Sequence, residues 1–157
     1  MTNNKYRHIG KPLDRKEAQA KVTGQAVYTH DMEIPGMLHA KLLLSPHARA
    51  KIVSIDASEA LALPGVKAVL TGRDCPYLVG LYMIDKRIIA RGEVRYQGEI
   101  VAAVAAETEK IAEKAVSLLK VVYEELEAVH TLDQALEAKI LVHDDINELE
   151  YMKVVFF

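Results

Sequence analysis

The chain has 157 residues, half of them hydrophobic, which suits one globular domain with an ample core. A net charge of −2, with Lys and Arg scattered, gives no basic stripe of the kind that binds nucleic acid. The longest wholly apolar run, residues 100–106, is too short to cross a bilayer, and residues 1–8 lack the apolar run of a signal peptide.

The first predicted helix follows a polar N-terminal arm. Asp14 and Glu17 have capping-box spacing, which predicts a short helix from Asp14 through Ala20. Gly24 is expected to end this element, in a conformation with positive φ.

Residues 38–44 form the first predicted strand, which Pro46 ends. Its residues alternate with the two-residue period of a half-buried strand. One set is Leu38, Ala40, Leu42 and Leu44, and the other is His39, Lys41 and Leu43.

A strand, a helix and a third strand are predicted next. Residues 51–55 are the second strand. Asp56 and Glu59 form a second capping-box pattern that opens a helix through Leu63. After a Pro-Gly turn, residues 66–70 form the third strand.

The second half begins with an irregular stretch, residues 71–93, with a short edge strand expected at 87–90. Gly98 supplies a positive φ in a turn ahead of a buried strand, residues 100–105. Thr108 is expected to cap a helix with apolar positions at helical spacing, namely Ile111, Ala112, Ala115, Leu118 and Leu119. A strand at 121–123 precedes a short helix through Ala138, opened by a capping box of Thr131 and Gln134.

These elements predict an α+β fold, a single domain in which short helices pack on one mixed β-sheet. We assign all of residues 1–157 to it, with an arm at 1–17, a core at about 18–129 and a tail at 130–157 that we expect to be truncated. The tail ends in four apolar residues, so we expect it to seek a partner or to form a homo-oligomer.

Several segments, in this order, resemble the a/b hammerhead domain that begins the molybdenum-binding large subunit of the xanthine dehydrogenase/aldehyde oxidase family. The loop at residues 77–86 departs from it, because it is short and not rich in proline. The matching segments are KVTGQAVYTHD (21–31), IPGMLHA (34–40), SPHARA (45–50), SIDASEA (54–60), LPGVKAVLT (63–71), VRYQGEIVAAVAAET (94–108) and VVYEEL (121–126).

The resemblance implies a hammerhead domain of an oxidoreductase that is structural and non-catalytic alone, with no catalytic, cofactor-binding or metal-binding residue in this chain. The complete enzyme would use molybdopterin-molybdenum, a 2Fe–2S centre and FAD. The implied partners are the remaining molybdopterin-binding domains and the iron–sulfur and FAD subunits. Two alternatives stay open: a free-standing module that docks a separate molybdenum-enzyme subunit, and an unrelated small enzyme that uses His and Asp groups.

The candidate reactive groups favour structural roles. His30-Asp31 and His143-Asp144-Asp145 pair imidazole with carboxylate, but no metal-ligand spacing accompanies them. The single cysteine, Cys75, excludes an internal disulfide and an iron–sulfur cluster and fits the cytoplasm. The carboxylate of Asp74 beside it raises a thiol pKa, so we expect an unreactive thiol.

The roles of the remaining polar candidates are less clearly indicated by the sequence. Arg49 and Arg95 could bind an anion, although an interface with a neighbouring domain is favoured for both. His39 and His47 are expected to hydrogen-bond the backbone rather than to catalyse. A phosphate cradle between Gly92 and Gly98 is not indicated, because the clustered glycines and the following Lys-Ser/Thr are missing.

Overall fold

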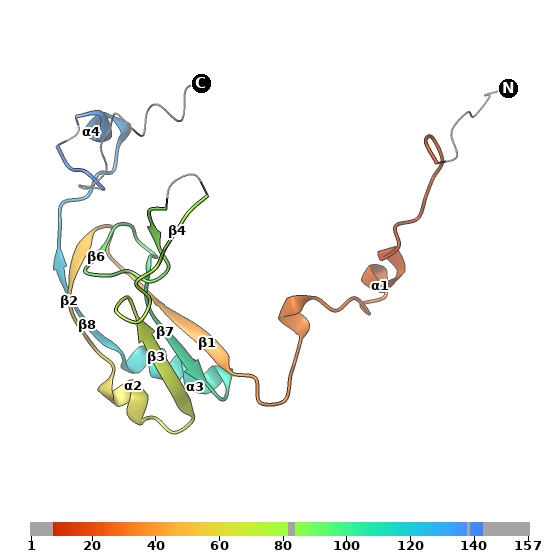
Figure 1. The fold of residues 1–157 in the computed structure, drawn as a ribbon, viewed down its shortest axis with the longest axis horizontal. Coiled ribbons are helices and arrows are strands. Elements are labelled where there is room, and N and C mark those ends of the chain that lie inside the picture. The colour runs from red at the N-terminus through yellow and green to blue at the C-terminus, as the bar shows by residue number, and fades with distance from the viewer. Residues whose placement is uncertain (1–7, 82–83, 138, 143–157) are drawn as a thin grey trace. The chain divides into compact units, whose positions relative to one another are not determined.

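The computed structural model describes residues 8–81, 84–137 and 139–142 (Figure 1). The chain divides into two compact units, Met1–Met37 and Leu38–Phe157. The first contains α1 (Ala18–Val22) and a short 3-10 helix, η1 (Thr29–Asp31). The second contains α2 (Ser58–Ala62), α3 (Glu109–Leu118), α4 (Leu132–Leu136), β1 (His39–Leu44), β2 (Ala50–Asp56), β3 (Val66–Thr71), β4 (Leu78–Val79), β5 (Lys86–Arg87), β6 (Glu93–Val94), β7 (Ile100–Ala106) and β8 (Lys120–Glu125).

The α+β class is confirmed, but the strands of the described residues are divided among three antiparallel sheets rather than joined in one mixed sheet. Sheet A has the order β1-β7-β3, sheet B has the order β6-β2-β8, and β4 pairs with β5. The register between β1 and β7 shifts at Leu43 and Leu44, where β7 carries one additional residue, Val101. Strand β7 contributes to two cores, because its side chains alternate between two faces: Val101 lies in one core, and Ala102 and Val104 lie in the other.

Helices α2 and α3 both contact sheet A and each other. Ala60 of α2 and Ala115 of α3 are fully buried with Ala102 and Val104 of β7. The second core joins β2, β6 and β7 through residues that are almost completely buried: Ala50, Ala90, Val94 and Val101. Leu43 packs against both cores and so connects them.

Strand β1 alternates as predicted, but its leucine-rich set is the exposed one. Leu42 and Leu44 are 48% and 49% exposed, whereas Lys41 and Leu43 lie on the more buried side. Lys41 Nζ lies 2.6 Å from Glu109 Oε1 and 3.2 Å from Glu113 Oε1, both on α3. The helix layer therefore receives the charged side of this strand, and the apolar side faces away from it.

The first two predicted capping boxes do not form, although the Asp56 carboxylate still accepts an N–H at the start of α2. α1 begins at Ala18, after a turn closed by the Ala18 N–H and the Arg15 carbonyl at 3.0 Å, so Asp14 caps no helix. α2 begins at Ser58, whose N–H donates to Asp56 Oδ1 at 2.9 Å. Glu59 does not complete a box, because its carboxylate pairs with Lys120 instead.

The later helix starts are confirmed. Thr108 Oγ1 accepts the Ile111 N–H at the start of α3. Thr131 and Gln134 form the reciprocal capping box of α4. Only Arg87 of the predicted edge strand at 87–90 lies in a strand, β5, since Ile89 and Ala90 turn into the core. Both predicted positive-φ glycines are confirmed, with φ of 71° at Gly24 and 89° at Gly98.

Candidate functional site

Two segments that stand far apart in the sequence, residues 45–50 and 94–99, meet at one end of sheet A. The Ser45 N–H donates to the Glu99 carbonyl at 2.8 Å, and the Gly98 N–H donates to the Ser45 carbonyl at 2.9 Å. Ser45 Oγ accepts the His47 N–H at 3.1 Å, which holds the Ser-Pro-His turn closed. Gly98 completes the contact because its positive φ turns the chain from Tyr96 into β7.

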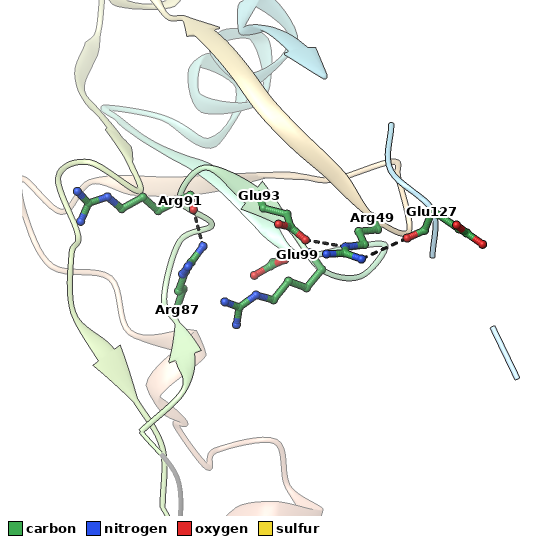
Figure 2. A network of polar contacts seen from close by, with 7 residues as sticks. Arg49, Arg87, Arg91, Glu93, Glu99 and Glu127 are labelled. Atoms are coloured by element: carbon green, nitrogen blue, oxygen red, sulfur yellow. Dashed lines mark hydrogen bonds and ion pairs between the residues drawn. The ribbon is translucent and has the colours of Figure 1, made fainter. Parts of the chain in front are cut away.

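A polar network lies beside this junction (Figure 2). Arg49 Nε lies 2.7 Å from Glu93 Oε1, and its Nη1 donates to the Glu127 carbonyl at 3.4 Å. Arg49 thereby ties the start of β2 to β6 and to the segment after β8. Its side chain is 20% exposed, so this pair is better shielded from water than a surface salt bridge.

Glu99 is the most deeply buried acid of the network. The residue is 5% exposed, and its Oε2 accepts the Arg95 N–H at 2.5 Å. Glu93 and Glu99 were not among the candidates from sequence. The available signal for Glu99 was an acid directly before an apolar strand, and its partner is a backbone N–H, which no residue type marks.

Arg49 and Arg95 also border a hollow of about 170 Å³, which is open to the surface. Its other walls are small or apolar residues and two polar ones: Ala48, Tyr96, Gln97, Ala128, Val129, Ile140 and Val142. The structure thus brings the two arginines together. It gives Arg49 an intramolecular acid as partner, and the role of both in an interface stays a prediction.

The histidines are spread through the fold. His47 contacts the Tyr123 ring at a centroid distance of 4.8 Å, and its Nδ1 lies 3.9 Å from Glu125 Oε1. Burial raises the pKa of the Tyr123 hydroxyl. Asp31 accepts the Tyr28 N–H at 2.9 Å in the turn of η1.

No group of three His, Cys, Asp or Glu side chains in the described part of the chain could hold a metal ion. His143, Asp144, Asp145 and the apolar end of the tail lie outside the described residues.

Asp74 closes the turn that follows β3. Its Oδ2 accepts the Thr71 N–H at 2.8 Å and the Thr71 hydroxyl at 2.9 Å. The Thr71 N–H and hydroxyl hold the pKa of this carboxyl below its usual value of 3.8. Asp74 therefore has a local structural role next to Cys75, which is partly buried and forms no disulfide.

The carboxylate of Asp74 is expected to make stability depend on pH. Because folding lowers its pKa, its contribution is complete above about pH 4 and is lost as pH falls through the lowered folded value. Asp74→Asn is expected to melt below the wild type at pH 7, and the difference should shrink as pH falls through the lowered folded-state pKa of Asp74. Thermal melts across this range measure the effect. Asp14→Asn is the control, and a constant difference for Asp74→Asn at every pH would contradict the assignment.

No helix among the described residues is long and apolar enough to span a membrane. Residues 23–127 match the family model described as "Aldehyde oxidase and xanthine dehydrogenase, a/b hammerhead domain". This match covers both segments of the junction, so the buried turn contacts belong to the shared domain.

Individual relatives agree with the family model. The chain is 41% identical to a probable xanthine dehydrogenase subunit of Bacillus subtilis (strain 168), over 90% of this chain and 20% of that protein. It is 34% identical to "Nicotinate dehydrogenase large molybdopterin subunit" of Eubacterium barkeri, over 90% of this chain and 34% of that protein.

A solved structure has the same fold. Quinoline 2-oxidoreductase from Pseudomonas putida 86 superposes with a TM-score of 0.80 at 38% identity, covering 88% of this chain and 19% of that one. The chain thus spans about a third or less of the length of each of these proteins. From the family match and the shared fold, this chain belongs to the aldehyde oxidase and xanthine dehydrogenase family, of which it is the a/b hammerhead domain.

Proposed function

We propose that this chain is a structural, non-catalytic domain that functions only with the molybdopterin-binding segments of a molybdenum hydroxylase. The observation that carries the proposal is the extent of the match, since 90% of this chain corresponds to only 20% of the Bacillus subtilis protein. The reaction centre is assigned to the other four-fifths. The complete enzyme would work in the cytoplasm, with molybdopterin-molybdenum in this subunit and with 2Fe–2S and FAD partner subunits.

The residues of this chain favour a structural role over a catalytic one. An iron–sulfur cluster needs about four cysteine thiolates, and the chain has one cysteine. Relatives named for xanthine, nicotinate and quinoline all share the domain. A part common to enzymes named for different substrates is better suited to shaping the subunit than to choosing the substrate.

The test replaces the homologous segment of the Bacillus subtilis protein with the full chain and co-expresses this chimera with its partner subunits. We expect molybdenum and dehydrogenase activity in the chimera, and neither in the isolated chain, by elemental analysis and a dye-reduction assay. Stoichiometric molybdenum in the isolated chain after dialysis, or a chimera that fails to take up molybdenum, would overturn the proposal.

A further inference from the structure

Sheet A has one face that neither α2 nor α3 covers, and this face is apolar. Directly paired residues of antiparallel strands point to the same side of a sheet. The register therefore aligns Ala40, Ala105 and Ala68 in one row and Leu42, Ala103 and Leu70 in the next. We call these six residues the open face. Leu42 and Leu70 are each 48% exposed, and the six positions carry no charged side chain.

The polarity of this face is the reverse of what a solvent-facing sheet shows. An antiparallel sheet with one face in water normally places polar residues on that face. In sheet A the charged Lys41 points to the helix side instead, where it meets two glutamates of α3. Leu42 of β1 and Leu70 of β3 are left on the side without helices.

Sheet B of the same domain follows the usual rule and serves as an internal comparison. Its exposed pairs are charged or mixed: Lys51 lies opposite Glu124, Asp56 lies opposite Lys120, and Ser54 lies opposite Val122. Lys51 Nζ and Glu124 Oε2 are 3.7 Å apart, with both side chains more than 60% exposed. Val53 and Val122 of sheet B are also exposed, at 53% and 54%, but charged pairs flank them. The open face of sheet A has no charged side chain, which points to a covering partner on sheet A.

The chemistry of the open face limits what can cover it. Alanines on the central strand β7 allow a packing element to approach closely, and leucines on β1 and β3 flank it on both sides. Without charged groups, the face can select only an apolar surface, such as the apolar stripe of a helix. The chain corresponds to 20% of the Bacillus subtilis protein, so polypeptide of the same subunit is available at high effective concentration.

We propose that the open face of sheet A is the surface on which the remainder of the molybdopterin-binding subunit packs. This inference rests on the proposed function and adds the contact surface and the apolar character of the partner element. It assigns Leu42 and Leu70 to the centre of an interface between domains.

Cysteine labelling of the same chimera tests the surface. Leu42→Cys, Leu70→Cys and the control Val122→Cys are each made in a Cys75→Ser background, in the isolated chain and in the chimera. Val122 lies in β8 of sheet B, and its exposed fraction of 54% is close to the 48% of Leu42 and Leu70. A maleimide should modify all three in the isolated chain, and assembly should slow labelling at positions 42 and 70 by at least about tenfold but leave position 122 labelled.

The outcomes separate the two proposals. A chimera that holds molybdenum but labels at positions 42 and 70 as fast as at 122 would overturn the open-face assignment and leave the proposed function standing. A chimera that does not assemble without any substitution would overturn both. A second copy of this chain is the alternative partner for the open face, and sedimentation of the full chain tests for it. A homodimer that protects positions 42 and 70 from labelling would overturn the assignment to the rest of the enzyme subunit.

Discussion

Gly72→Ala is expected to lower the free energy of unfolding by about 3 kcal/mol or more. A Cβ added at Gly72 would lie 2.1 Å from the Ala90 carbonyl oxygen and 2.8 Å from the carbonyl carbon. These are backbone atoms, so no side-chain rotation can relieve the overlap. Ala90 is 1% exposed, and its N–H donates to the Ile100 carbonyl at 2.7 Å. Relief therefore requires the segment to leave the second core.

Urea and thermal unfolding of the isolated chain measure this effect, which should lower the melting temperature by about 10 °C. Gly98→Ala is the matched comparison, because a Cβ there has nothing within 4 Å and only the φ of 89° is unfavourable. That variant is expected to lose about 1 kcal/mol. A Gly72→Ala variant as stable as Gly98→Ala would show that the segment carrying Ala90 gives way without cost.

Glu99→Ala is expected to have the second largest effect, about 2–3 kcal/mol. The substitution leaves the Arg95 N–H without its carboxylate acceptor at a site where Glu99 is 5% exposed. It also leaves a void beside the turn that joins Ser45 to β7. Glu99→Gln keeps an acceptor oxygen on a side chain of the same size, and it should recover part of the loss.

Urea unfolding of the wild type, Glu99→Ala and Glu99→Gln at pH 7 tests this prediction. Glu124→Ala is the control, because its side chain is 61% exposed and its pairing with Lys51 is long, so it should change stability by less than about 0.5 kcal/mol. Equal losses for Glu99→Ala and Glu124→Ala would mean that the Arg95 N–H finds another acceptor. The junction would then not depend on this carboxylate.

The features that could be predicted from the sequence are those with local causes. Thr108 and Thr131 precede helices whose first N–H groups they accept, and both interactions lie within four residues. The turn before β7 was predictable for the same reason, since the positive φ of Gly98 is a property of one residue. Strand β7 was identified because its residues are apolar on both faces, as a central strand requires.

The cap at Asp14 failed although its spacing was right. Capping-box spacing can occur by chance. Whether the cap forms depends on which other hydrogen-bond partners compete for the side chain and the backbone. At Glu59 that partner is Lys120, on a strand 61 residues away. No local pattern contains this information.

The sequence by itself determined the family, the α+β class and the positions of most strands and helices, because these follow from motifs and from periodicity. Only the tertiary structure decided which side of β1 is buried, how the strands divide into sheets, and which acids hold Arg49 and the Arg95 backbone. The two-residue period of β1 reports that its faces differ, and the apolar set is normally buried. Here α3 offers carboxylates to Lys41, so Leu42 and Leu44 face outward while Leu43 packs inward, and that choice depends on contacts between residues that are distant in the chain.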